Sequence, residues 1–497
     1  MIEAVYGQQV GGNLFHSFSQ FNLTSTESAS FRGPSSVQNI LARVTGGSAS
    51  QIDGLIRSEI PGANLFLLNP SGVMFGPNAK IDLSGALTVS TANYLLLADG
   101  GKFNSSIGGN DVLTSAAVSA FGFLSTTPSA VSFNQTQLTT QPGKDLTVIA
   151  GDISLTGANL NASGGHVSLF SAGSTGEISF DPAVPSSEFF NSTVTKFGAL
   201  SVSKSSTVQT ADQGKIVLRG GKLTVLNSKI AQNNTTTSPG GGISIEADSA
   251  TVSNGATINS TTSSLGASGD IQLHTGSFEL SNDGGIYSTS IGHGKAGDIF
   301  VTSDNITMQG SDPAGVKTGI FGFSLSAPGG NIQVSANNLL SISNVGLYGA
   351  DISISGANGT ISGVKLYSST NQVSLSVGGV PIDNPGTGSD GGSSITSVNA
   401  GTGATSSGGV SVEFSLSVPV FSYSLFVTGA LPFLIAPMPP DPSALTAVTA
   451  NEGEFQALNG KMVLNSVGTS DSLTFSVDPQ LKIKGAPVRL KHSKREH

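Results

Sequence analysis

A short element, a glycine followed two residues later by an isoleucine, returns at nearly constant spacing in the middle of the chain. The intervals between successive isoleucines are 27, 28, 28 and 33 residues. The five anchors are Ile216, Ile243, Ile271, Ile299 and Ile332. Seven residues after each anchor stands a second apolar point, at Leu223, Ala250, Phe278, Ile306 and Leu339. Four units have a third point, at Ile230, Ile258, Ile286 and Leu347, whereas the unit 299–331 carries five extra residues and reaches Ile320 late.

This repeat constrains the fold strongly, because a single unit cannot bury its own apolar face. Each apolar point begins a run in which apolar and polar residues alternate, and such a run places its apolar side chains on one face of a short strand. In a stack of units, each strand bonds to the same strand one rung away, at about 4.8 Å. The sequence therefore predicts an all-β fold: a right-handed parallel β-helix, or single-stranded solenoid, with three strands per rung.

Two polar positions repeat in the same register. One, eleven residues after the anchor, holds Asn227, Asn254 and Asn282, and asparagine tolerates the left-handed conformation of a turn. The other holds Asp270, Asp298 and Asn331. Two stacked carboxylates could form a metal site or an acid–base pair, but a turn position is favoured because Lys215 and Gly242 fill it in other rungs.

Composition excludes several classes of protein. The 497 residues include no cysteine, which rules out disulfide scaffolds, thiolate metal sites and thiol nucleophiles. With 22 Lys and Arg against 31 Asp and Glu, the net charge is 22 − 31 = −9, which argues against a nucleic-acid-binding face. The histidines are scattered and are expected to be turn or surface residues: His16, His166, His274, His293, His492 and His497. We expect no catalytic residues, no metal site and no cofactor.

The first residues, 1–7, have neither a basic segment nor an apolar one, so they are not a signal peptide. No run of 18 apolar residues occurs, so no transmembrane segment is predicted.

Residues 12–125 do not follow the simple repeat but contain several distinctive blocks in a fixed order. The central block is Asn69, Pro70, Ser71, Gly72 and Val73. Upstream lie Asn39, Arg43, Val44, Thr45, Gly46, Gly47, Asp53 and Gly54, and downstream lie Ser90-Thr91-Ala92-Asn93 and Phe121-Gly122-Phe123-Leu124. The ordered blocks closely resemble the two-partner-secretion, or haemagglutination-activity, domain at the N-terminus of filamentous-haemagglutinin-type exoproteins.

The resemblance covers about a quarter of the chain and implies a secretion-signal motif at residues 69–73, supported by the upstream residues. It also implies export through an outer-membrane two-partner-secretion transporter to the medium or the bacterial cell surface. Two features depart from the family pattern. Ser71 replaces its asparagine, and its earlier Asn-Pro-Asn-Leu element has only a loose counterpart at 33–36. The family also carries a signal peptide and further residues upstream, so we expect the N-terminus of this chain to be truncated.

The central block has two interpretations. Asn at the first, Pro at the second and Gly at the fourth position favour a type I turn, which alone would make a tight corner between two strands. The resemblance adds that the same corner matters for export. Both interpretations remain open at this stage.

We predict four regions along the chain. Residues 1–125 form the two-partner-secretion domain and residues 126–383 the β-helix repeats. A Gly/Ser-rich linker at 384–409 leads to a C-terminal β segment at 410–497, which ends in a basic tail.

The leading functional hypothesis is a secreted surface exoprotein, adhesin- or haemagglutinin-like, that is not an enzyme and that presents a long polar face to host or neighbouring-cell glycans. One alternative is a carbohydrate-active β-helix enzyme, which needs a carboxylate cluster that is not visible in the sequence. Another is a structural matrix protein.

Overall fold

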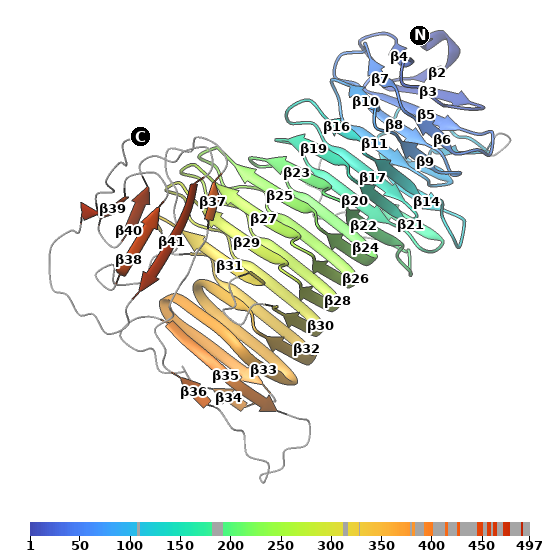
Figure 1. The fold of residues 1–497 in the computed structure, drawn as a ribbon. Helices are drawn as coiled ribbons and strands as arrows, with labels where there is room; N and C mark the ends of the chain where they lie inside the picture. The colour runs from blue at the N-terminus through green and yellow to red at the C-terminus, as the bar shows by residue number, and fades with distance from the viewer. Residues whose placement is uncertain are drawn as a thin grey trace.

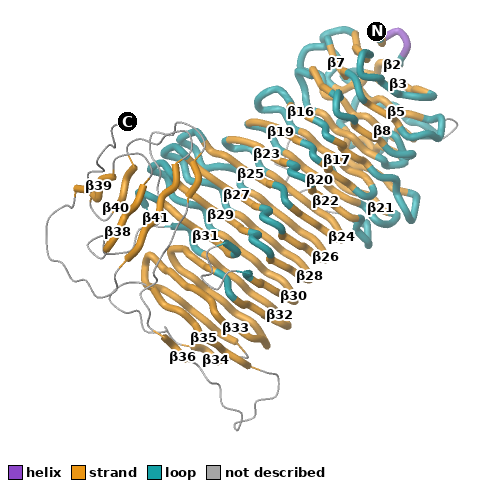
Figure 2. The backbone as a smooth tube through the Cα atoms, viewed as in Figure 1, coloured by secondary structure: helices purple, strands orange, loops and turns teal. Residues whose placement is uncertain are grey.

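The chain forms an elongated stack of β-rungs, with the N-terminus at one end (Figure 1). A computed structural model describes residues 1–106, 110–180, 192–311, 317–327, 329–377, 380–382 and 392–400, and seven short strands between 413 and 490. Strands on the three faces of the stack are joined by loops at its corners (Figure 2). Within the described residues, no helix has the length and apolar character needed to cross a membrane.

The first face is one parallel ladder through the N-terminal rungs. Its strands, in spatial order, are β3 (Asn13–Phe18), β5 (Asn39–Val44), β8 (Asn64–Leu68), β11 (Leu87–Ser90), β17 (Leu146–Ala150) and β20 (Val167–Ser171). At the N-terminal end, β2 (Gln8–Val10) pairs with β3 in the antiparallel direction and follows a short 3-10 turn, Ala4–Tyr6. This reversed strand covers the edge of the ladder.

The other two faces follow the same order. The second consists of β6 (Ser50–Ile52), β9 (Val73–Phe75), β15 (Val131–Asn134), β18 (Ile153–Thr156) and β22 (Ala199–Ser203). The third begins as a separate sheet of β1 (Ile2–Glu3), β4 (Ser28–Arg32), β7 (Leu55–Ser58) and β10 (Lys80–Asp82). It continues with β16 (Gln137–Thr139), β19 (Asn159–Ser163), β23 (Thr207–Ala211), β25 (Lys229–Asn234), β27 (Thr257–Thr262), β29 (Gly285–Ser290) and β31 (Gly319–Ser324).

From residue 216 onward the first two strands of each rung are continuous. The long strands are β24 (Ile216–Leu226), β26 (Ile243–Ser253), β28 (Ile271–Ser281), β30 (Ile299–Gln309) and β32 (Ile332–Ser343). Strand β33 (Gly346–Val377) also includes a third-face strand, because its first residues pair with β31 and later ones with β32. Strand β24 shows the relation, because its first part pairs with β20 and its second part with β22. The predicted parallel β-helix is therefore confirmed, and the predicted three runs appear here as one bent strand plus one short strand.

The anchor isoleucines stack in one interior column, as their spacing predicted. Ile216 pairs with Ile243, and the column continues through Ile271 and Ile299 to Ile332. All five are at most 1% exposed. The third points stack likewise, including the late Ile320.

One core prediction was wrong. Leu339 is 48% exposed, and Leu340 takes the interior place beside Ile306. The pairing of β30 with β32 shifts between Ser303 and Asn305, so this rung holds one extra residue. A one-residue shift turns a side chain to the opposite face of a strand.

The two polar ladders are connections between rungs. Asn227, Asn254 and Asn282 have φ of 44°, 59° and 48°, the left-handed conformation expected of them. The Asp298 backbone N–H donates to Asp270 Oδ1, and the Asn331 N–H donates to Asp298 Oδ1, each at 2.8 Å. These carboxylates therefore tie one rung to the next.

A small antiparallel sheet covers the outside of the N-terminal rungs. Its strands, in spatial order, are β13 (Lys102–Asn104), β12 (Tyr94–Leu97), β14 (Val118–Phe123) and β21 (Gly176–Ser179). Their apolar side chains form a second core with outward-facing residues of the first face, such as Leu41, Phe66 and Phe170. Because β14 pairs with β21, this sheet crosses residue 125, where a domain boundary was predicted.

The C-terminal third is described only in its strands. Strands β34 (Val380–Ile382) and β35 (Gly392–Ala400) pair with β33, and β36 (Glu413–Ser415) pairs with β35. Strand β35 lies within the segment predicted as a Gly/Ser-rich linker, 384–409, and the rest of that segment lies outside the described residues. The others are β37 (Leu425–Val427), β38 (Leu445–Ala450), β39 (Phe455–Leu458), β40 (Lys461–Leu464), β41 (Asp471–Val477) and β42 (Arg489–Leu490). Most of the predicted basic tail lies outside the described residues.

Candidate functional site

The block Asn69–Val73 forms a tight corner between β8 and β9. The Gly72 N–H donates to the Asn69 carbonyl at 3.0 Å, and Gly72 has φ of +108°. The Ser71 N–H donates to Asn69 Oδ1 at 2.9 Å. The predicted turn is therefore present, with the asparagine side chain bonded back to the backbone.

Asn69 also holds a loop of the preceding rung. Its side chain is fully buried, and Nδ2 donates to the Ser48 carbonyl and to Ser50 Oγ, both at 3.0 Å. The Ser50 N–H donates to the Gly72 carbonyl at 3.0 Å. This corner is thus more than a local turn, because it fixes the two rungs relative to each other.

The predicted Gly46 and Gly47 begin the loop that reaches this corner. A Cβ on Gly46 would lie 2.1 Å from the Ser19 carbonyl oxygen, and Gly47 has φ of +76°. Thr45, next to them, donates from Oγ1 to the Phe18 carbonyl at 3.1 Å, and Val44 is buried. The geometry requires glycine at both positions, because any side chain would clash or strain the backbone.

Asp53 and Gly54 lie at a different corner. Asp53 accepts hydrogen bonds from the backbone N–H and the Nδ2 of Asn78, both at 2.9 Å, and the side-chain bond first and then the backbone bond lower the pKa of Asp53. A Cβ on Gly54 would lie 2.3 Å from the Glu27 carbonyl oxygen. The predicted residues therefore occupy separate corners rather than one cluster.

Asn39 belongs to a ladder that the sequence analysis missed. Asn39 Nδ2 donates to Asn13 Oδ1 at 2.9 Å, and Asn64 Nδ2 donates to Asn39 Oδ1 at 3.0 Å. Asn13 in turn donates to the carbonyls of Thr114 and Ala116, at 3.0 and 2.7 Å. The signal was present, because each asparagine precedes a Leu or Ile at intervals of 26 and 25 residues.

Arg43 connects the β-helix to the covering sheet. Its Nη1 donates to Asp111 Oδ2 at 2.7 Å and to the Asn104 carbonyl at 2.5 Å, while Nε donates to Ser17 Oγ at 2.7 Å. The guanidinium lies over the Phe103 ring, 4.4 Å from its centroid. Asp111 and Phe103 could not be inferred as partners, because nothing in the local pattern relates residues 60 to 70 positions away.

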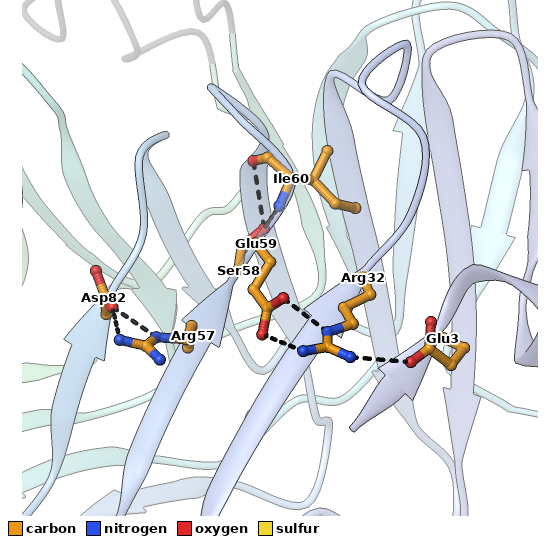
Figure 3. Close-up of polar contacts among 7 residues, drawn as sticks. All are labelled: Glu3, Arg32, Arg57, Ser58, Glu59, Ile60 and Asp82. Atoms are coloured by element: carbon orange, nitrogen blue, oxygen red, sulfur yellow. Dashed lines mark hydrogen bonds and ion pairs between the residues drawn. The ribbon is translucent and has the colours of Figure 1, made fainter.

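Exposed ion pairs cross the first strands of the third face, as Figure 3 shows. Arg32 lies between Glu59 at 2.7 Å and Glu3 at 3.8 Å, and Arg57 lies 2.6 Å from Asp82. The hydrogen bond to Glu59 is the main cause that raises the pKa of Arg32. These side chains are 39–46% exposed, so they set the strand register more than they stabilise the fold.

His16 is a buried residue, contrary to the expectation for the histidines. It is 2% exposed, points into the first rung beside Phe31 and Phe18, and its Nε2 has no hydrogen-bond partner within the described residues. Burial lowers the pKa of His16. His16 was missed because the expectation rested on the scattered positions of the histidines, which give no sign of the aromatic cluster that closes the first rung. His492 and His497 lie outside the described residues.

We expect the lowered pKa of His16 to make the N-terminal rungs less stable in acid. Below about pH 6.5 the unfolded chain takes up a proton that the folded chain does not, so the free energy of unfolding falls as the pH falls toward the folded-state pKa. Urea unfolding between about pH 7.5 and pH 5 measures this slope. The control variant is His16→Leu, because Leu67 occupies the equivalent position two rungs along the stack. This substitution should make the free energy of unfolding less dependent on pH. An unchanged pH dependence would contradict the assignment to His16.

The described residues contain no group of three or more His, Asp or Glu side chains arranged to hold a metal ion. The corner residues offer hydrogen-bonding groups and no nucleophile with a base beside it.

Comparison with known proteins gives one sequence family. Residues 2–225 match the family model described as the TPS secretion domain, a region that contains both corners and the covering sheet. No curated protein matches the chain.

A solved structure has the same fold. The crystal structure of the HMW1 secretion domain from Haemophilus influenzae superimposes with a TM-score of 0.53, at 17% sequence identity, over 75% of this chain and 98% of that one. At this identity the likeness concerns the fold alone.

Proposed function

Residues 2–225 are a TPS secretion domain, and from this premise we propose that the protein is an adhesin-like surface exoprotein that is exported by two-partner secretion. The family match over these residues carries the proposal. Export requires a dedicated transporter in the outer membrane, and the protein acts outside the cell or on its surface.

We assign the export signal to the corner at residues 69–73, with the upstream residues 39–54 in support. The support is that Asn69 holds two rungs together from a fully buried position. A transporter that recognises this domain would meet a corner whose shape depends on that one side chain.

Beyond export, the protein presents its β-helix to glycans and performs no catalysis. The long faces carry mostly Ser, Thr and Asn, and only 11% of the residues in the chain are charged. The stacked Asp270 and Asp298 accept backbone N–H groups, which leaves them engaged in structure. Such a rigid, polar, weakly charged surface suits hydrogen bonding to neutral saccharides.

Expression with an added signal peptide in a Gram-negative host tests the export proposal. The chain should appear in the medium or on the surface only when a matching two-partner-secretion transporter is co-expressed. The control is an unrelated outer-membrane transporter, which should leave the chain in the periplasm. Release that is independent of the transporter would overturn the proposal.

Two other functions give different results. A carbohydrate-active β-helix enzyme would release reducing sugars from pectin-like or alginate-like polymers, and a single carboxylate substitution would abolish that activity. A structural matrix protein would form filaments without any binding partner. Neither outcome is expected of a glycan-binding exoprotein.

A further inference from the structure

An open cavity of about 420 Å³ lies at the N-terminal end of the stack, outside the first rungs. It is lined by the turn before β2, by β2, β3 and β5, and by the covering sheet. Its lining includes Tyr6, Gln8, Ser17, Arg43 and Asp111. The volume is within the range of small-molecule sites, about 300–1,000 Å³.

The guanidinium of Arg43 supplies hydrogen-bond donors to this cavity. The side chain is only 10% exposed, and its Nε and Nη1 groups are bonded to Ser17, Asn104 and Asp111. Nη2, which carries two N–H donors, makes no hydrogen bond within the described part of the chain. Because the bonds of Nε and Nη1 fix the guanidinium, Nη2 is a preorganised hydrogen-bond donor, and ligand binding would cost the side chain little conformational entropy.

Asp111 supplies an acceptor next to it. Oδ1 accepts from the backbone N–H and Nδ2 of Asn104, at 2.9 and 3.1 Å. Oδ2 accepts from Arg43 Nη1 at 2.7 Å, and a carboxylate oxygen can accept a second hydrogen bond. The cavity thus offers a donor and an acceptor side by side.

The charges of the lining residues favour a neutral ligand. Arg43 and Asp111 cancel, so the lining has no net charge to attract a carboxylate or a phosphate. A hydroxyl can accept from Arg43 while a neighbouring hydroxyl donates to Asp111, as two adjacent hydroxyls of a sugar ring do. The ring of Tyr6, 74% exposed at the rim, offers an apolar face to the C–H face of such a ring.

We propose that this cavity binds a neutral hexose or N-acetylhexosamine unit of a glycan. The inference rests on the proposed glycan-binding function and deepens it, because it places one sugar site inside the secretion domain itself. An extended peptide is less well matched, since it would present a row of backbone groups rather than two adjacent ones.

Saturation-transfer difference NMR on the purified, folded full chain tests the site. The probes are the methyl glycosides of glucose, galactose, N-acetylglucosamine and glucuronic acid. At least one neutral glycoside should bind, and the glucuronide should bind at least about tenfold more weakly, a factor that corresponds to 1.4 kcal/mol. Tyr6→Ala should weaken binding about tenfold without lowering the unfolding temperature.

Two further variants make the result specific. Arg43→Lys keeps the positive charge beside Asp111 but removes Nη2, so it should abolish binding. Met74→Ala, at a residue 49% exposed and outside the cavity lining, should bind like the wild type.

Two outcomes would overturn the proposal: no neutral glycoside binds, or binding survives both Tyr6→Ala and Arg43→Lys. The assay needs no export, so a chain that binds sugar but leaves the cell without a transporter counts against the proposed function alone.

Discussion

Replacing Asn69 with alanine is expected to lower the free energy of unfolding of the N-terminal rungs by about 3 kcal/mol and to reduce secretion at least tenfold. The fully buried side chain makes three hydrogen bonds, and alanine would remove the partner of the buried Ser50 Oγ and of the part-buried Ser71 N–H and Ser48 carbonyl. Each buried polar group left unpaired costs about 1–3 kcal/mol. Urea unfolding gives the stability, and immunoblotting of medium and cells gives the secretion.

The matched control is Ser71→Ala in the same turn. Ser71 takes part through its backbone N–H, which the substitution keeps, so both stability and secretion should stay near wild type. If Asn69→Ala is secreted normally, the corner is not the export signal. If it is as stable as the wild type but is not secreted, the transporter reads the asparagine directly.

Phe278→Ala is expected to destabilise the central rungs by about 3–5 kcal/mol. Phe278 is 2% exposed and stacks between Ala250 and Ile306, so its ring fills the space that the small Ala250 leaves. The substitution would place two alanines on successive rungs and leave a cavity that the stiff sheet cannot close. Hydrogen exchange of β26, β28 and β30 should accelerate together, because each rung contacts only its neighbours.

Glu279→Ala is the control for this prediction. Glu279 is the next residue on the same strand and is exposed, so its removal should change stability by less than about 0.5 kcal/mol. Equal effects of the two substitutions would mean that Phe278 is not a core residue of the stack.

The central rungs were predictable because their information is local and periodic. The anchors from Ile216 to Ile299 recur every 27 or 28 residues, and a stack with one interior places such residues in one column. The prediction was wrong at Leu339, where an extra residue changes which neighbour faces inward. The period of the repeat predicts which residues stack in the interior column, but it does not predict where a strand contains an extra residue.

The corner at Asn69 was predicted as a turn, whereas its bonds to Ser48 and Ser50 were not. The covering sheet was missed altogether, since its strands pair with residues of other rungs and follow no repeat. The Arg43–Asp111 pair and its cavity depend on that sheet. The sequence analysis could not predict contacts between residues far apart in the chain, and the candidate ligand site is built from such contacts.

The stacking direction of the rungs has a mechanical consequence. Successive turns in the middle of the chain are 27 or 28 residues apart, and neighbouring strands lie about 4.8 Å apart along the axis. A pulling force on one end of the chain would act on the hydrogen bonds between the terminal rung and its neighbour first. Each rung that detaches would release about 90 Å of extended chain. Under the proposed adhesive function, a cell held by this protein in shear flow would be slowed by successive unfolding steps rather than released by one abrupt rupture.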